Sequence, residues 1–497
     1  MGIELLLEMA VTGHGERVAI GSRDGGLTYG HLQRLAAGTA TLLTEARASH
    51  LATVGVIGPL LPVSLFGAAM AGVPAVPLNY RLTAAALDEL LDSLETPFVV
   101  ADKEFVDQLR HGGRPVMTTD ELFAAAEAAQ PAPPAFADDD SAAVVLFTSG
   151  TTSKPKGVLL SHGNLSSYVM TTVDFGSASA DECQLIAVPP YHVAGVGSAL
   201  TSTYSGRRVV HLPQFTPEGW LTTVRTEGVT TAMVVPTMLA RVTEHLEGGP
   251  GNVPTLRSLA YGGARMPRPV LERALDAFPH VGFTNAYGLT ETSSTIAVLG
   301  PDDHRASMAA TEPSIASRLG SVGRAVPGVE IAVRDESGAP LPSPEVGEIL
   351  VRGPQVSGAY VGLGSVLTED GWFPTKDRGW LDAEGYLFIE GRSDDTIIRG
   401  GENIAPAEVE EVLVRHPAVR DCAVFGLPDE EWGERIAAVV VVQPAAVLTD
   451  DEVKAFVRAT LRGSRTPDDV FFLDELPYSP TGKLLRRELV DRLGGAV

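Results

Sequence analysis

The ten residues Thr148–Gly157 constrain this chain more than any other stretch. Their sequence is TSGTTSKPKG, and they lie between two apolar runs, Ala142–Phe147 and Val158–Leu160. Short apolar runs of this kind predict buried strands, so we expect a tight turn between two strands. Glycines in the turn allow close approach of a ligand. Hydroxyls, lysines and backbone N–H groups are what a polyphosphate requires.

The common nucleotide-binding patterns do not fit this turn. The pattern G-x-x-x-x-G-K-[ST] would need a glycine where Pro155 stands. No G-x-G-x-x-G opens a helix after a strand elsewhere in the chain. A polar hairpin turn without a ligand has the same composition, so the other motifs decide between the two interpretations.

The acidity of the chain argues against a nucleic acid or an anionic membrane as partner. Its 497 residues carry a net charge of −24, which repels phosphate overall. The two cysteines, Cys183 and Cys422, predict no disulfide framework or cysteine metal site and fit a reducing compartment. The N-terminus has no basic region typical of a secretory signal. We expect a cytoplasmic protein.

The first part of the chain alternates between helix and strand patterns. Leu51–Tyr80 has no charged residue, but four prolines divide it. We interpret it as strand 52–57, helix 62–71 and strand 73–78 rather than a membrane span. Helix patterns at Tyr29–Leu43 and Ala84–Ser93 continue the alternation, which predicts a parallel sheet with helices on both faces.

A second motif, NAYGLTET, occupies Asn285–Thr292. We expect strand Val281–Thr284 to lead into a loop that presents Tyr287, Thr290 and Glu291. Mg²⁺ that arrives with a nucleotide prefers one or two carboxylates beside phosphate oxygens and waters, and Glu291 can supply one. An ordinary helix start with a capping Thr would use the same residues.

The third motif lies near the C-terminus, where Tyr478–Leu484 is YSPTGKL. Pro480 and Gly482 predict a tight turn that projects Lys483. A flexible ammonium group is suited to bridging two anions that repel each other. The alternative is a tail lysine without a specific role.

Together the three motifs resemble those of the adenylate-forming superfamily, which includes acyl- and aryl-CoA ligases, peptide-synthetase adenylation domains and luciferases. The likeness covers nearly the whole chain. It implies an α/β fold, with a large N-terminal domain of stacked α/β subdomains and a β-rich subdomain, followed by a small mobile α+β C-terminal domain. We expect the N-terminal domain at 1–391 and the C-terminal domain at 392–497.

The resemblance also assigns roles to residues. Lys483, Glu291, Thr290 and His192 are the expected catalytic residues, and Glu291 is the metal ligand. His192, in a Pro-aromatic-His-x-x-Gly pattern, would border the acid pocket with Met238 and Gly288. Asp394 would be the hinge. The expected nucleotide and cofactor contacts are Thr148, Ser149, Gly150, Thr151, Thr152, Lys156, Gly262, Gly263, Ala264, Tyr287, Asp377, Arg392, Gly400 and Gly401.

One motif departs from the family pattern. The family usually has Thr-Gly-Asp where this chain has Thr375-Lys376-Asp377. The carboxylate of Asp377 can accept hydrogen bonds from both ribose hydroxyls. We expect Lys376 to point outward, although it could also add positive charge near the nucleotide.

The resemblance implies a two-step reaction with ATP, Mg²⁺ and coenzyme A. The ionised carboxylate of an aliphatic or aromatic acid attacks the α-phosphorus of ATP, releasing pyrophosphate and forming an acyl-adenylate. Rotation about Asp394 then removes Lys483 and brings Gly400 and Gly401 to line a path for the thiol. We expect a monomer or homodimer.

Three alternatives stay open at this stage. The chain could load a carrier protein, could adenylate an unusual anion or serve an unusual acceptor, or could be a catalytically silent ligand-binding homologue. Lys376 leaves room for the second alternative. The presence of Lys483, Glu291 and the intact loop argues against the third.

Overall fold

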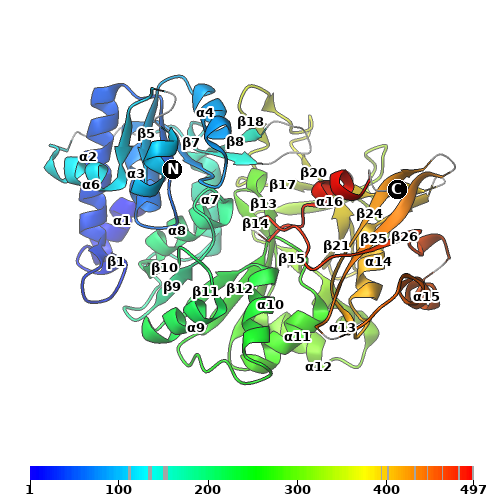
Figure 1. Ribbon diagram of the computed structural model, residues 1–497. Coiled ribbons are helices and arrows are strands. Elements are labelled where there is room, and N and C mark those ends of the chain that lie inside the picture. Colours follow the sequence, from blue (N-terminus) through cyan, green and yellow to red (C-terminus); the bar gives the residue numbers. More distant parts are fainter. Residues whose placement is uncertain are drawn as a thin grey trace.

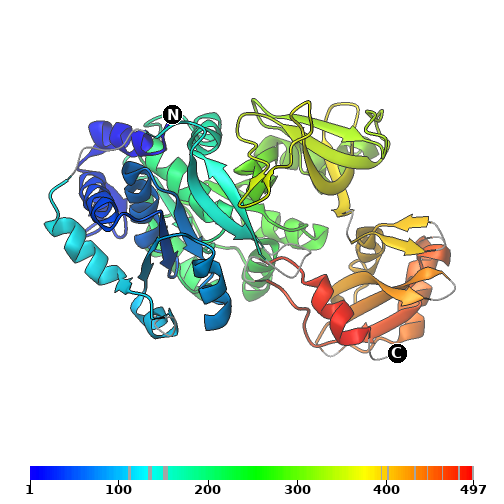
Figure 2. The same ribbon diagram turned by 90° about the horizontal axis from the view of Figure 1, so that it is seen from above.

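The computed structural model has a larger part, coloured blue to yellow in Figure 1, and a smaller C-terminal part, coloured orange to red. Figure 2 shows the smaller part beside the β-rich unit of the larger one. The structure describes residues 1–494 apart from 110–112, 132–136, 149–154, 393–394, 400–401, 430–431, 445, 462 and 480–481.

One sheet of the larger part extends from a parallel body into an antiparallel edge. Its strand order is β15 (Arg324–Ala325), β14 (Ser294–Leu299), β13 (Gly282–Leu289), β12 (Ser258–Gly262), β11 (Thr231–Val234), β9 (Cys183–Ile186), β10 (Arg208–His211), β1 (Val18–Ile20) and β2 (Leu27–Thr28). The strands from β13 to β1 are parallel, as the alternating pattern predicts. β14 and β15 add antiparallel strands beside β13.

A second sheet contains the strands that flank Thr148–Gly157, which we call the phosphate-loop motif. Its order is β19 (Gly364–Ser365), β18 (Ala359–Tyr360), β8 (Lys156–Ser161), β7 (Ala142–Thr148), β4 (Ala75–Leu78), β3 (His50–Val54), β5 (Pro97–Ala101) and β6 (Val116–Thr118). The predicted pair of strands around the motif is confirmed, because β7 and β8 pair antiparallel from Ala142–Ser161 to Thr148–Lys156.

Helices cover these sheets and pack against one another between them. In chain order they are α1 (Glu4–His14), α2 (Tyr29–Ala46), α3 (Leu60–Ala71), α4 (Ala84–Asp92), α5 (Val106–Leu109), α6 (Thr119–Ala128), α7 (His162–Thr172), α8 (Val193–Ser205), α9 (Pro217–Thr226), α10 (Pro236–His245), α11 (Arg268–Ala277), α12 (Pro301–Ala309), α13 (Pro313–Ser317), α14 (Pro406–Leu413), α15 (Asp450–Thr460) and α16 (Arg486–Leu493). Helix α3 is apolar on all sides because it lies between its own sheet, α2 and α8.

The β-rich unit and the C-terminal part each have their own sheet. The first has the order β16 (Glu330–Arg334), β17 (Gly347–Arg352), β20 (Phe373–Leu381) and β21 (Leu387–Arg392). The second has the order β23 (Glu402–Ile404), β22 (Ile397–Arg399), β25 (Gly433–Val442) and β24 (Val419–Asp429), with β26 (Asp469–Phe472) paired to β25. The chain passes from one part to the other between β21 and β22. A capping box of Thr449 and Glu452 begins α15.

One expected strand differs from the structure. The strand predicted at 52–57 ends at Val54, because the Val56 N–H donates to the Asp102 carboxylate (2.9 Å) instead of continuing the sheet. The β-rich unit begins after the large sheet ends, since Arg324–Ala325 still pair with β14 while β16 begins at Glu330.

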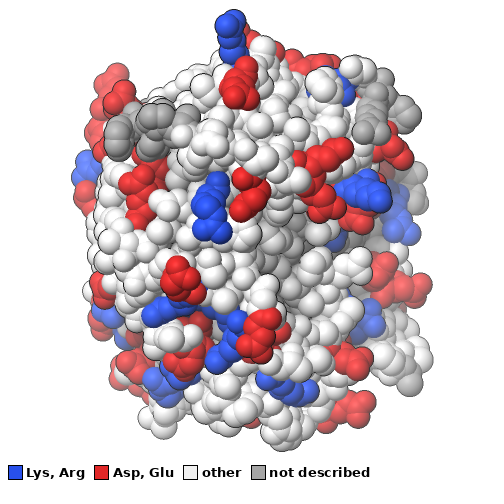
Figure 3. All heavy atoms as spheres, turned by 90° about the vertical axis from the view of Figure 1, so that its left-hand side faces the viewer, with Lys and Arg blue, Asp and Glu red and all other residues white. Residues whose placement is uncertain are grey.

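Two observations bear on what the surface can bind. Acidic and basic side chains are interspersed on the face shown in Figure 3. Within the described residues, no helix combines the length and the apolar character that crossing a bilayer requires.

The packing of α2 on α6 gives a stability prediction. A Cβ added at Gly38 would lie 2.0 Å from the backbone oxygen of Ala126, so Gly38→Ala must separate the two helices. We expect a loss of about 1–3 kcal/mol in the free energy of unfolding, measured by denaturant titration. Gly13→Ala is the matched control in α1, because its Cβ would have nothing nearer than Phe175 at 4.0 Å. Equal stability of the two variants would contradict this account.

Candidate active site

The NAYGLTET motif forms most of a hairpin rather than a loop. We expected the strand to end at Thr284, but β13 continues to Leu289, so Tyr287 lies within a strand. The β13–β14 register shifts between Tyr287 and Gly288. A Cβ at Gly288 would lie 1.7 Å from the Ser294 carbonyl oxygen, so only glycine lets the two strands approach this closely. Gly288 is therefore required by the hairpin itself, whether or not it also borders a substrate.

The end of this hairpin is a short, constrained turn. A 3-10 turn, η3 (Thr290–Thr292), carries Thr290 and Glu291. The Thr292 hydroxyl donates to the Leu289 carbonyl (3.0 Å) and accepts from the Leu289 N–H (3.0 Å). Ser293 and Ser294 follow with φ values of 55° and 108°. Positive φ at two successive non-glycine residues is strained backbone, which persists only where neighbouring contacts enforce it.

Asp377 joins this hairpin to the β-rich unit. The Tyr287 hydroxyl donates to Asp377 Oδ2 (2.5 Å), and Arg392 Nε lies 3.7 Å from Asp377 Oδ1. Asp377 and Arg392 are direct partners in the β20–β21 register. Asp377 is only 8% exposed. Burial raises the pKa of Tyr287, and the Asp377 charge raises that pKa further, so the phenol keeps its proton and donates.

The residue beside Asp377 adopts a conformation that glycine prefers. Lys376 has a φ of 63° and is exposed. β20 bulges here, because its register against β17 passes from Pro374 to Arg378 while β17 advances only from Leu350 to Glu348. A non-glycine residue in the left-handed region costs about 1–2 kcal/mol. The exposure of Lys376 agrees with the outward orientation that we expected.

Glu291 is held from a neighbouring sheet. The Tyr360 hydroxyl donates to Glu291 Oε1 (2.8 Å), and the Ser357 N–H donates to the Glu291 backbone oxygen (2.8 Å). Tyr360 belongs to β18, which pairs with β8. No sequence motif marks Tyr360, because it is a single tyrosine in a glycine-rich stretch.

His192 begins a helix next to the end of β9. It is the N-cap of α8, and its Nδ1 accepts from the Ala194 N–H (3.3 Å). Burial lowers the pKa of His192 to about 4. The imidazole is therefore neutral at pH 7 and carries its proton on Nε2, where it can donate to a ligand. Burial also lowers the pKa of His211, at the end of β10, to about 4; no motif pointed to this residue.

The phosphate-loop motif is described only at its ends. The Thr148 hydroxyl donates to the Lys156 carbonyl (3.4 Å), and both residues are partly buried. Ser149, Gly150, Thr151 and Thr152 lie outside the described residues, as do Asp394, Gly400 and Gly401.

The glycine pair after β12 is where close strand packing requires it. A Cβ at Gly262 would lie 2.2 Å from the Ala286 carbonyl oxygen of β13, and Gly263 has a φ of 82°. Ala264 follows and is partly buried. The pair therefore leaves the sheet beside the strand that carries Tyr287. Met238, by contrast, lies on α10 within a hydrophobic core and is 9% exposed.

The turn Tyr478–Leu484 of the C-terminal part, which we call the lysine turn, contacts the larger part. A Cβ at Gly482 would meet Val235 at 2.8 Å and the Thr237 hydroxyl at 3.0 Å, so this turn touches the start of α10. Figure 1 shows the red segment before α16 reaching across to the green layers. The turn closes through two hydrogen bonds, from the Ser479 N–H to the Lys483 carbonyl (2.7 Å) and from the Lys483 N–H to the Ser479 hydroxyl (3.0 Å). The Lys483 residue is exposed.

Side-chain bonds anchor the lysine turn at both ends within its own domain. The Tyr478 hydroxyl donates to Asp421 (2.9 Å) on one side, and on the other Arg486 donates to Glu410 (2.6 Å) of α14.

A second contact between the two parts involves Arg265, which donates to the Ala407 carbonyl (3.3 Å) and pairs with Glu411.

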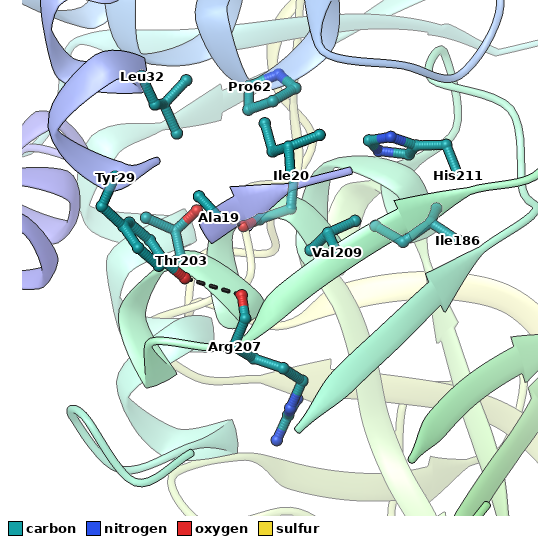
Figure 4. A pocket seen from close by; sticks show the side chains of 11 residues that line it. Ala19, Ile20, Tyr29, Leu32, Pro62, Ile186, Thr203, Arg207, Val209 and His211 are labelled. Carbon is teal, nitrogen blue, oxygen red and sulfur yellow. Dashed lines mark hydrogen bonds between the residues drawn. The ribbon is translucent and has the colours of Figure 1, made fainter. Parts of the chain in front are cut away.

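A small cavity elsewhere in the larger part is not the substrate site. It lies between β1, α2 and α8, where Ile20, Leu32 and Val209 line it (Figure 4). The Tyr29 hydroxyl beside it donates to the Arg207 carbonyl (2.8 Å). The space open to a water-sized sphere is about 10 Å³, which has room for one water and not for an organic acid.

The described residues include no group of three or more His, Cys, Asp or Glu side chains placed to hold a metal ion. A nucleotide-bound Mg²⁺ does not need such a cage, because it takes most of its ligands from phosphates and waters. One carboxylate at Glu291 fits that mode of binding.

Comparison with known families gives matches over most of the chain. A family model described as AMP-binding enzyme matches residues 7–361, and one described as AMP-binding enzyme C-terminal domain matches residues 408–483. A feruloyl-CoA synthase from an Amycolatopsis species is 34% identical over an alignment of 483 residues, and the match covers 95% of this chain and 95% of that protein. The fatty acid–[acyl-carrier-protein] ligase ScoC of Streptomyces coeruleorubidus is 35% identical and covers 87% of this chain and 84% of its own length.

Solved structures agree with these matches. The O-succinylbenzoate coenzyme A synthetase of Bacillus subtilis, in complex with ATP and magnesium ion, superposes with a TM-score of 0.83. It is 28% identical and covers 97% of this chain and 98% of its own. The chain therefore belongs to the AMP-binding enzymes of the adenylate-forming superfamily and is an AMP-forming acid–thiol ligase.

Proposed function

We propose that this enzyme adenylates an aliphatic or aromatic carboxylic acid with ATP and transfers the acyl group to coenzyme A. The observation that carries the proposal is the meeting of Tyr287, Asp377 and Arg392, with Glu291 on the same hairpin as Tyr287. These groups offer one acceptor for vicinal hydroxyls, one cation and one carboxylate within a compact region. That combination suits a nucleoside phosphate bound with a divalent cation.

In the first half-reaction the acid attacks the α-phosphorus of ATP. Asp377 would accept the ribose hydroxyls, Thr290 would donate to the α-phosphate, and the phosphate-loop residues would hold the β- and γ-phosphates. Glu291 would hold Mg²⁺, which when bound neutralises charge on the pyrophosphate that leaves. Lys483 would offset the repulsion between the incoming carboxylate and the α-phosphate. The neutral imidazole of His192 adds no charge to the acid pocket.

The second half-reaction requires the thiol to reach the acyl-adenylate. In the arrangement described here the lysine turn is seated on α10, which suits adenylation. We propose that the domains divide directly after Arg392, the last residue of β21 and one residue beyond the expected boundary between 391 and 392, and that rotation about Asp394 withdraws Lys483. Gly400 and Gly401 would then line the path of the thiol. The sulfur attacks the acyl carbon, the C–O bond to phosphate breaks, and AMP leaves with the bond electrons.

The names of relatives support this range of acids and suggest two candidate acceptors of the acyl group, coenzyme A and a carrier protein. One relative is named for ferulate and one solved neighbour for O-succinylbenzoate, both with coenzyme A. Another relative is named for a fatty acid and an acyl carrier protein. A carrier-protein acceptor is thus the second candidate function, while coenzyme A is the acceptor that we favour.

A panel of acids tests the proposal directly. Pyrophosphate release should appear with at least one aliphatic or aromatic acid, and adding coenzyme A should raise turnover and give a thioester detectable by mass spectrometry. Thioester formation only on an added carrier protein would select the second candidate. An enzyme that binds ATP but releases no pyrophosphate with any acid would contradict both.

Lys483 should act in adenylation and not in folding. Lys483→Ala removes the ammonium group and keeps the backbone N–H and carbonyl of residue 483 that close the turn with Ser479. We expect pyrophosphate release to fall by at least about 100-fold, because one group that stabilises developing charge contributes that much. Lys103→Ala, at an exposed site in a 3-10 turn, is the matched control and should keep the wild-type rate.

Asp377 should determine affinity for the nucleoside. Asp377→Asn keeps the shape of the side chain but removes the charge between Tyr287 and Arg392. We expect AMP binding, measured by calorimetry without metal, to weaken by about 10-fold or more. Asp303→Asn is the control, because Asp303 likewise accepts from a tyrosine, Tyr386 (2.6 Å), outside this site. Wild-type AMP affinity in Asp377→Asn would refute the assignment.

A further inference from the structure

We propose that Tyr360 is a positioning residue that fixes the Glu291 carboxylate for the metal-bound nucleotide and ties it to the strand that follows the phosphate loop. The inference deepens the proposed function, on which it rests, by adding a residue that no motif identified. Its support is the set of contacts made by the segment 355–361, which we name the brace.

The first two contacts fix the brace to β8. Tyr360 is the β-sheet partner of Val158, and the Val361 N–H donates to the Gly157 carbonyl (2.8 Å). Gly157 is the last residue of the phosphate-loop motif, and Val158 directly follows it in β8. The backbone that carries the Tyr360 ring is therefore held to β8, the strand that begins at the phosphate-loop motif.

Three further hydrogen bonds fix the brace to the turn that carries Glu291. The buried Gln355 side chain donates to the Thr292 carbonyl (3.0 Å) and to the Thr295 carbonyl (2.8 Å). The Ser357 N–H donates to the backbone oxygen of Glu291. These bonds satisfy carbonyls of a turn with two strained φ values and hold it against the brace.

With the backbone held on both sides, the Tyr360 hydroxyl selects the rotation of the Glu291 carboxylate. It donates to Oε1 at 2.8 Å, so Oε2 is the oxygen presented for coordination. A carboxylate that is oriented by a hydrogen bond binds metal better than one that rotates freely.

Tyr360→Phe tests the proposal, because it removes only the hydroxyl and keeps the ring. The readout is the concentration of Mg²⁺ that gives half-maximal pyrophosphate release, at saturating ATP and acid. We expect it to rise by about 10-fold or more, while the rate at saturating Mg²⁺ recovers toward wild type. Metal-free AMP binding should stay unchanged, because it does not use Glu291.

Tyr386→Phe is the matched control. It also removes a tyrosine hydroxyl that donates to a carboxylate, Asp303 at 2.6 Å, but outside the candidate site. It should leave the half-maximal Mg²⁺ concentration unchanged. Partial unfolding of either variant lowers the amplitude of the titration and not its midpoint, so a folding defect does not imitate the expected result.

Two results would overturn the role of Tyr360. One is a wild-type Mg²⁺ midpoint in Tyr360→Phe, and the other is a rate lowered equally at every Mg²⁺ concentration. If wild-type enzyme releases no pyrophosphate with any acid, the proposed function fails separately. The Mg²⁺ dependence of ATP binding, measured by calorimetry, then still tests Tyr360 by the same comparison of midpoints.

Discussion

The buried carboxylate of Asp377 is the group around which the candidate site is arranged. A negative charge that is only 8% exposed must be matched by donors or cations, and Tyr287 and Arg392 provide them. Tyr287 comes from the large mixed sheet, while Asp377 and Arg392 come from the β-rich unit. The same interaction that satisfies the charge therefore fixes the position of one unit against the other, and with it the hairpin that carries Glu291.

The backbone of that hairpin is strained, and hydrogen bonds from neighbouring residues stabilise it. Gly288 permits a close approach of two strands, and the chain then reverses through two residues with positive φ before it re-enters the sheet. Such a turn persists because the Thr292 hydroxyl, Gln355 and Ser357 satisfy its backbone groups. A carboxylate on a rigid turn loses little conformational freedom when it binds a ligand, which suits a residue that must meet a metal ion.

The lysine turn follows a different principle. It belongs to a domain with its own sheet and hydrophobic core, and it reaches the larger part at Gly482. The same domain also contacts the larger part through the ion pair between Glu411 of α14 and Arg265. Hydrogen bonds of Tyr478 and Arg486 fix the residues on either side of the turn to their own domain. A turn carried by a separate domain suits the proposed two-step reaction, in which Lys483 is needed for the first step and withdrawn for the second.

The amino-acid sequence by itself determined the alternating α/β layers, the strands around the phosphate-loop motif and the family, because periodicity and short motifs are local properties. It also identified Tyr287, Glu291, Asp377 and Lys483 by type. Only the tertiary structure decided that Tyr287 lies in a strand and donates to Asp377, that Lys376 occupies a bulge, and that Tyr360 reaches Glu291. Those pairs are separated by about 70 to 90 residues, and strand register, which sets such contacts, depends on packing between sheets that no local pattern encodes.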